Sequence, residues 1–171
     1  MSGGAQHLTF CLGGERYALP LPRVREILRY EQPATPVPGV PPSIRGVIPL
    51  RGRVVPVVDL AVRFGRPPLA ATRWTCLVLV EVDVEGEPTP LGMMVDVVDT
   101  VVELAAEDVL PPPAFGTAIR ADFLEGMARG AEGLTLLLDV DRVLAHHELL
   151  AAGALAAGAP EAPGASGEVP A

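Results

Sequence analysis

The stretch IRGVIPLRGRVVPVVDL, residues 44–60, indicates a β-hairpin with more apolar side chains than one buried face requires. It turns at Arg51-Gly52, where glycine accepts the positive φ of a tight turn. A strand buried on one face alternates apolar and polar residues, whereas the valines at positions 54, 55, 57 and 58 cover both faces. Either both faces are buried inside the protein, or a partner covers one of them.

The first half of this hairpin leads to the same two alternatives. If Val47 faces the core, Ile48 and Leu50 face outward together beside Arg51. Pro49 and Pro56 have no N–H for a ladder bond, so we expect them at an edge, a bulge or a solvent-facing position. The hairpin ends at Asp59, which we expect to cap the short helix LAVRF.

Turn signals recur along the rest of the chain and predict further hairpins. Gly13-Gly14 divides residues 8–21, Glu85-Gly86-Glu87 separates 76–86 from 89–104, and glycines at 130 and 133 divide 121–140. Many short strands with turns between them are typical of small β-barrels or sandwiches. We therefore expect a mainly β protein.

Helical signals are few. Residues 22–30 predict a helix, because Pro22 suits a first helical position and Val24, Ile27 and Leu28 have helical spacing. Residues 32–43 hold five prolines and predict an extended connector. Asp141 is expected to cap a last helix. Residues 151–171 are mostly Ala, Gly and Pro and predict a largely disordered tail.

Composition and charge restrict the functional class. Leu, Val, Ile and Phe make up about 30% of the 171 residues, enough for a packed core. No apolar run approaches the ~20 residues of a membrane span and no secretory signal is visible, so we expect a cytoplasmic protein without membrane insertion. Residues 1–74 carry a net charge of +6 and residues 75–171 one of −14. This layout argues against nucleic acid and favours docking onto proteins.

Residues of the types that carry chemistry have simpler interpretations. Cys11 and Cys76 lie in apolar runs, as small buried thiols do, and Ser43 lacks a nucleophile motif. His146-His147 are neighbours on a predicted helix and point about 100° apart, which does not suit one metal ion. Asp139 and Asp141 lack the glycine loop of a phosphate site. We predict no catalytic residue, no metal site and no cofactor.

Six blocks in order along the chain resemble the CheW family of bacterial chemotaxis coupling proteins. They are FCLGGERYALPLPRVREIL, TPVPGVPPSIRGVIPLRGRVVPVVDLAVRFG, GMMVDVVDTVVEL, LPPPAF, FLEGMAR and LTLLLDVDRVL. The second block is the most specific. The resemblance covers residues from about 8 to 145 and leaves the tail outside, so we assign residues 6–150 to a CheW-like domain and 151–171 to the tail.

The resemblance implies two small five-stranded, SH3-like β-barrels that are intertwined and packed on a shared apolar core. It implies a non-catalytic adaptor that couples the cytoplasmic tips of chemoreceptors to the regulatory domain of the histidine kinase CheA. Other CheW-like domains in array rings are further implied partners, and the protein would be recruited to membrane-associated arrays. One alternative is a regulatory CheW-like piece of a kinase or of a coupling–receiver fusion. Another is a small-ligand or oligonucleotide-binding barrel, which would need aromatic residues clustered with the arginines, and the sequence has no such cluster.

The resemblance also assigns roles to particular residues. Val24 and Glu26 match the family's receptor-facing segment, and Arg51 matches its arginine turn; Ile48 and Leu50 accompany Arg51 as receptor-binding candidates. Gly46, Gly52 and Pro56 match positions that set backbone geometry, while Asp59 is expected to cap rather than to bind. Pro49 stands where many relatives have Asn, so a side-chain hydrogen bond is lost there.

Overall fold

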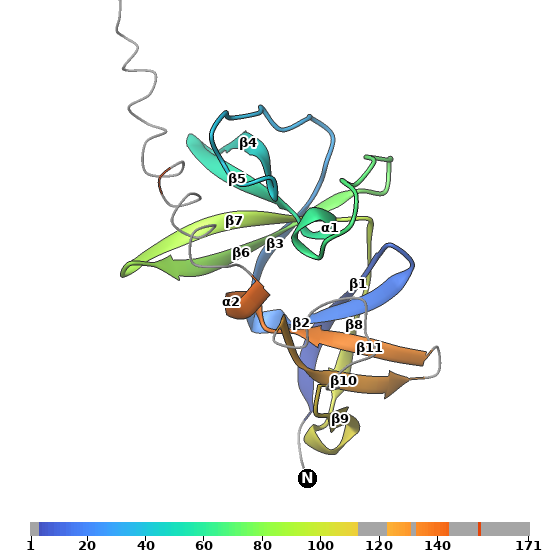
Figure 1. Ribbon diagram of the computed structural model, residues 1–171. Coiled ribbons are helices and arrows are strands. Elements are labelled where there is room, and N and C mark those ends of the chain that lie inside the picture. The colour runs from blue at the N-terminus through green and yellow to red at the C-terminus, as the bar shows by residue number, and fades with distance from the viewer. Residues whose placement is uncertain (1–3, 113–122, 131–132, 144–153, 155–171) are drawn as a thin grey trace, which may run out of the picture.

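The chain folds into two curled β-sheets, one above the other in Figure 1. The computed structural model describes residues 4–112, 123–130, 133–143 and 154. The upper sheet has the strand order β3 (Val24–Arg29), β6 (Cys76–Val84), β7 (Glu87–Val95), β5 (Arg53–Asp59) and β4 (Ile44–Leu50). The lower sheet has the order β8 (Val97–Leu104), β1 (Ala5–Leu12), β2 (Glu15–Pro20), β11 (Gly133–Leu138), β10 (Leu124–Gly130) and β9 (Val109–Leu110).

The short helices α1 (Leu60–Arg63) and α2 (Val140–Val143) lie near the level at which the sheets meet (Figure 1). Two 3₁₀ turns, Leu21–Arg23 and Ala106–Asp108, precede β3 and β9. The predicted mainly β fold with few short helices is confirmed. One sheet has six strands rather than five, because the two-residue β9 adds to the edge of β10.

The two sheets are intertwined along the chain. The lower sheet begins with β1 and β2, the chain then builds the whole upper sheet, and it returns for β8 to β11. The return places β11 parallel to β2, with Leu136 opposite Tyr17, and in the upper sheet β5 lies parallel to β7. The lower sheet therefore combines two segments that are far apart in sequence, whereas the upper sheet is built from the continuous stretch 24–95.

One apolar core is shared by both sheets, as predicted. It includes Phe10 and Tyr17 from the lower sheet and Phe64, which follows α1 of the upper half. Consecutive ring centroids in the series Phe10, Tyr17, Phe64 and Phe123 lie 5.7, 5.5 and 5.7 Å apart. Rings at this spacing pack favourably and hold the two halves together.

The structure decides between the two explanations for the apolar hairpin. Val55, Val57 and Val58 of β5 are 2% exposed or less, so both faces of this strand are buried inside the protein. In β4 the orientation is the reverse of the one considered first: Ile48 faces the core, and Val47 is only half-buried. The backbone of Val47 exchanges hydrogen bonds with Thr35, so the proline-rich connector pairs with this edge.

The prediction of a helix over residues 22–30 is wrong. After the 3₁₀ turn, β3 pairs antiparallel with β6, and the register shifts between Val24 and Glu26. Burial alternates along the strand, with Val24, Glu26 and Leu28 half-buried and the residues between them exposed. The shift and the inward-facing polar Glu26 disguise the two-residue period of a strand.

The predicted cap of the last helix lies two residues too late in the sequence. Asp139, not Asp141, accepts hydrogen bonds from the backbone N–H groups of Asp141 and Arg142 at 3.1 and 3.2 Å. Asp141 instead binds Arg23 with both oxygens at 3.1 Å. The later part of that predicted helix and nearly all of the predicted tail lie outside the described residues.

Candidate functional site

The central contact of the candidate site joins β3 to the β4–β5 turn. The guanidinium of Arg51 donates from Nη1 to Oε1 of Glu26 at 2.8 Å and from Nη2 to Oε2 at 2.5 Å. Such a two-point pair fixes orientation as well as distance. The Arg51 side chain stays 66% exposed and that of Glu26 30% exposed. The pair therefore lies at the surface, where a partner can reach the side chain of Arg51.

This ion pair shifts the pKa values of both residues. The hydrogen bonds from Arg51 hold the pKa of the Glu26 carboxyl below its ordinary value of 4.5. The same hydrogen bonds raise the pKa of Arg51 above its ordinary value. Both groups are therefore charged at neutral pH, and the pair presents a fixed dipole at the surface.

The turn itself directs Arg51 toward β3. Arg51 and Gly52 have φ values of +51° and +79°, and Leu50 pairs with Arg53, as in a two-residue hairpin turn with both central residues left-handed. The β6–β7 turn has the same form, with φ of +51° at Glu85. The positive φ of Arg51 is thus a property of this turn type and does not by itself indicate function.

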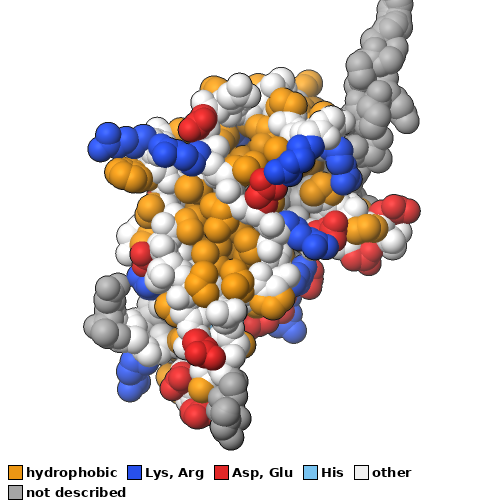
Figure 2. All heavy atoms as spheres, turned by 180° about the vertical axis from the view of Figure 1, so that it is seen from behind, with side chains coloured by type: hydrophobic (Ala, Val, Ile, Leu, Met, Phe, Trp, Pro, Cys, Tyr) orange, Lys and Arg blue, Asp and Glu red, His pale blue; other side chains and the backbone are white. Residues whose placement is uncertain are grey.

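An apolar groove of about 450 Å³ lies between the edges of β3 and β4. Its apolar walls come from Ile27, Leu28, Ile48, Leu50 and Leu77, and Arg29, Tyr30, Glu31, Gln32 and Pro49 complete the lining. The groove is formed by the two edge strands of one sheet, and the Arg51–Glu26 contact connects β3 with the turn that follows β4. Figure 2 shows one face of the molecule, on which apolar side chains gather in the middle and arginines and acidic residues lie around them.

The five receptor-binding candidates of the sequence thus come together only in part. Glu26 and Arg51 are in direct contact, and Ile48 and Leu50 line the groove. Ile48 is 8% exposed and contributes to the groove floor rather than to a free surface. Val24 is half-buried against the core and does not line the groove.

Sequence reasoning missed several groove residues. Their spacing predicts that Ile27 and Leu28 share one face of a helix, whereas in the structure Ile27 is 42% exposed and both residues line the groove of a β-sheet edge. Leu77 belongs to β6, which carries no signal of a binding role. Reading residues 24–29 as a strand would have placed Ile27 on the face opposite Glu26 and Leu28.

The predicted geometry-setting glycines have left-handed backbones. Gly46 has a φ of +149°, and a Cβ there would lie 2.2 Å from the carbonyl oxygen of Thr35. The close approach of the connector therefore requires glycine. Pro56 lies opposite Val47, one residue before β5 begins to pair with β7, so its missing N–H interrupts no bond to β7.

Asp59 is the centre of a buried network. Its side chain accepts hydrogen bonds from the backbone N–H groups of Ala61 at 2.9 Å and Leu69 at 3.0 Å, and more weakly from Val62 at 3.4 Å. Arg45 donates to the same carboxylate at 2.8 Å and to the carbonyl of Leu69. The residue is 1% exposed. It caps α1 and fixes the following loop, which leaves it unavailable to a partner.

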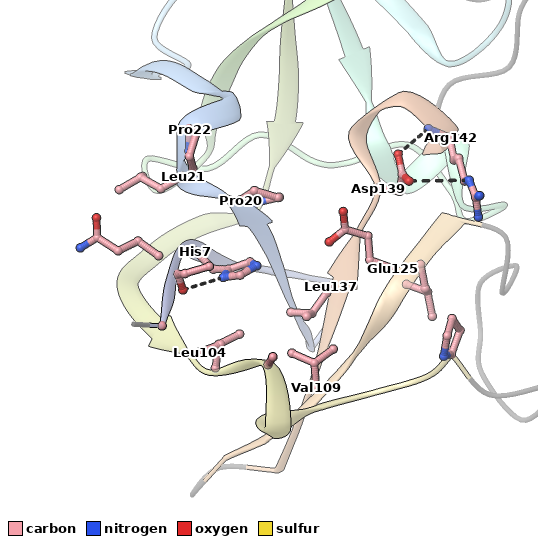
Figure 3. Close-up of a pocket in the computed structure, with 16 residues that line it drawn as sticks. His7, Pro20, Leu21, Pro22, Leu104, Val109, Glu125, Leu137, Asp139 and Arg142 are labelled. Atoms are coloured by element: carbon pink, nitrogen blue, oxygen red, sulfur yellow. Dashed lines mark hydrogen bonds and ion pairs between the residues drawn. The ribbon is translucent and has the colours of Figure 1, made fainter. Parts of the chain in front are cut away.

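A second, larger cleft of about 1140 Å³ lies at one end of the lower sheet (Figure 3). Leu21, Leu104, Val109 and Leu137 give it apolar walls, and an Arg142–Asp139 ion pair lies at its rim. His7 is 6% exposed, and its Nδ1 lies 3.1 Å from the carbonyl of Ala5. The exposed Leu110 of β9 follows Val109 directly.

The other chemical candidates of the sequence do not form a site. Asp139 caps α2 and Asp141 pairs with Arg23, while Cys11 and Cys76 are half-buried free thiols rather than fully buried ones. His146 and His147 lie outside the described residues. Within the described residues no three metal-binding side chains come together, and no helix is long and apolar enough to span a membrane.

Comparison with known proteins agrees with this architecture of two sheets. The model of the CheW-like domain matches residues 6–148. The chemotaxis protein CheW of Klebsiella aerogenes is 32% identical over 146 residues, which cover 85% of each chain. That of Bacillus subtilis is 31% identical over 143 residues, covering 82% of this chain and 87% of the relative.

A solved structure shows the same fold. The scaffolding protein TtCheW from Thermoanaerobacter tengcongensis superposes with a TM-score of 0.74 at 27% identity, covering 85% of this chain and 90% of that one. Family model, relatives and structure together show that the chain belongs to the CheW family. It is a chemotaxis coupling protein of the non-catalytic scaffold type.

Proposed function

We propose that this chain joins the cytoplasmic tips of chemoreceptors to the regulatory domain of the histidine kinase CheA. The observation that carries the proposal is the exposed Arg51–Glu26 pair beside an apolar groove. A charged, fork-shaped donor next to apolar surface is a frequent anchor at protein interfaces. Family membership supplies the setting of chemotaxis signalling.

The receptor's helical hairpin occupies the groove in this proposal. Arg51 donates to a carboxylate or carbonyl of the receptor, while Leu50 and Ile27 contact its apolar side chains. Glu26 acts as a positioning residue, because its two hydrogen bonds hold the guanidinium in one orientation. Val24 supports β3 from the core side.

The kinase regulatory domain binds elsewhere, at the end of the lower sheet next to the cleft of Figure 3. Leu110 is 39% exposed there, beside the cleft residue Val109. Two separate surfaces allow one small protein to hold both partners at once. Other CheW-like domains bind through the same sheet end, and the protein works in the cytoplasm at membrane-associated arrays.

A bridging experiment tests the proposal. A receptor-tip fragment and the kinase regulatory domain are mixed with the purified protein, and complexes are separated by size. We expect a three-component complex with the wild type. Arg51→Ala should lose the receptor and keep the kinase domain, whereas Leu110→Glu should do the reverse. A wild type that binds neither fragment, or variants that lose both partners equally while folded, would contradict the proposal.

A further inference from the structure

The turn formed by residues 72–75 displays an arginine and a tryptophan on a tightly bonded backbone. Thr72 donates its N–H to Oγ1 of Thr75 at 2.8 Å, and Thr75 returns its N–H to the carbonyl of Thr72 at 3.2 Å. The N–H of Trp74 binds Oγ1 of Thr72 at 3.1 Å. These bonds fix the backbone before any partner arrives, which lowers the entropy cost of binding.

The same turn is attached to β3. Arg29 donates from Nη2 to the carbonyl of Arg73 at 3.0 Å, and Tyr30 donates its N–H to the carbonyl of Thr75 at 2.9 Å. Arg29 and Tyr30 also line the groove of the candidate site. The turn is therefore continuous with that groove, at the end of β3 away from Glu26.

Trp74 is exposed in a manner that packing does not explain. Trp74 is 58% exposed, which is the highest value among the large apolar residues in the described part of the chain. The guanidinium of Arg73 stacks 5.0 Å from the ring centroid and makes no ion pair within the described residues. Tryptophan and arginine are the residue types most enriched among interface anchors, and here they are presented together on a rigid turn.

We propose that Trp74 and Arg73 form a second anchor for the chemoreceptor hairpin that also engages Arg51, and that this anchor recognises an acidic, amphipathic helix. The inference rests on the proposed function. Continuity with the groove favours this occupant over the kinase domain, which binds the opposite sheet. Arg29 already pairs with Glu31 at 3.6 Å, so it is the positive charge of Arg73 that favours an acidic residue on the helix.

The geometry also sets the spacing of the partner's residues. Glu26 and Arg29 are three residues apart on β3, about 10 Å at the rise of a strand, and Trp74 lies beyond Arg29. A helix advances about 1.5 Å per residue. The receptor residues that meet Arg51 and Trp74 are therefore separated by roughly two to three helical turns, on one face of one helix.

Trp74 is the single tryptophan of the sequence, so its fluorescence reports on this site alone. The full chain is titrated with a receptor-tip fragment that contains no tryptophan, and binding is measured in parallel by calorimetry. We expect the emission to move to shorter wavelength and acrylamide quenching to fall as the fragment binds. The kinase regulatory domain should leave both signals unchanged.

Variants distinguish this inference from the proposed function. Trp74→Ala should raise the Kd for the receptor fragment about tenfold, and Arg73→Ala should raise it less and reduce its salt dependence. Leu134 is an apolar residue of the lower sheet that is 49% exposed; Leu134→Ala is the control and should bind normally. If calorimetry shows that the wild type does not bind, the proposed function fails.

If the wild type binds with unchanged fluorescence and Trp74→Ala has the wild-type Kd, the second anchor is wrong and the proposed function stands. Vesicles containing anionic phospholipid provide the remaining test. A blue shift with vesicles, but none with the receptor fragment, would assign the turn to a membrane surface and overturn the inference.

Discussion

Replacing the buried carboxylate of Asp59 tests how the fold holds the candidate site. Asp59→Ala removes the acceptor for the N–H groups of Ala61 and Leu69 and the partner of Arg45. Each buried N–H left without a partner costs about 1–3 kcal/mol, and breaking one side of a buried ion pair costs about 3–5 kcal/mol. These costs overlap, because one carboxylate serves all three groups.

We therefore expect a loss near the lower end of that range, about 3 kcal/mol in the free energy of unfolding. Arg45 is 29% exposed, so water solvates its guanidinium once Asp59 is gone and limits the penalty. For a domain of this size the loss corresponds to a fall in Tm of roughly 9 °C. The assay is urea unfolding at neutral pH, with an unchanged m value showing that the unfolded state is the same.

Asp141→Ala is the matched control. Its carboxylate also binds an arginine, Arg23, but is 64% exposed, so its removal should cost less than about 1 kcal/mol. Equal losses for Asp59→Ala and Asp141→Ala would refute the reasoning, because burial would then have no bearing on the contribution of the carboxylate.

Three further predictions concern backbone geometry and pH. Gly46→Ala should lower the free energy of unfolding in urea by about 2 kcal/mol, because its Cβ would meet the Thr35 carbonyl. Gly14 also has a positive φ but open space around it, so Gly14→Ala should lower the free energy by about 1 kcal/mol. Burial, and then the hydrogen bond to Glu15, raise the pKa of Tyr17 above its ordinary value of 10. The neutral Tyr17 therefore stabilises the fold fully below pH 10, and this contribution is lost as the pH rises further. Tyr17→Phe should flatten the fall in Tm at alkaline pH. The hydrogen bonds from Arg51 lower the pKa of Glu26, so the pair contributes to stability fully above pH 4.5 and loses this contribution as the pH falls through the lowered pKa. The difference in Tm between the wild type and Glu26→Gln should therefore disappear below that pKa.

The hairpins could be predicted because the turns depend on the residues at the turn itself, not on distant contacts. Gly13-Gly14 and Arg51-Gly52 place glycine where φ is positive, and the structure turns at both positions. The disposition of the strands in two sheets with parallel β2–β11 and β5–β7 pairs could not be predicted from such signals. Those contacts join residues far apart in sequence; the family resemblance implies two intertwined barrels but not these parallel pairs.

The errors at the candidate site have a physical reason. Glu26 occupies an inward-facing position of β3 because Arg51 from another hairpin neutralises it, and this polar residue interrupted the apolar alternation of a strand. The exposed apolar Ile27 then completes the apparent helical spacing of Val24, Ile27 and Leu28. A polar residue on the half-buried face and an apolar residue on the exposed face thus account for the misassignment.

Binding of the receptor-tip fragment to Arg51→Ala tests the central claim most directly. The exposed side chain contributes little to folding, so Tm should stay within about 2 °C of the wild type. We predict a Kd for the receptor fragment raised about tenfold or more, and a Kd for the kinase regulatory domain within about twofold of the wild type. Arg51→Lys keeps the charge but not the two-point geometry, and should recover only part of the affinity. A folded Arg51→Ala protein that binds the receptor fragment as tightly as the wild type would contradict the account.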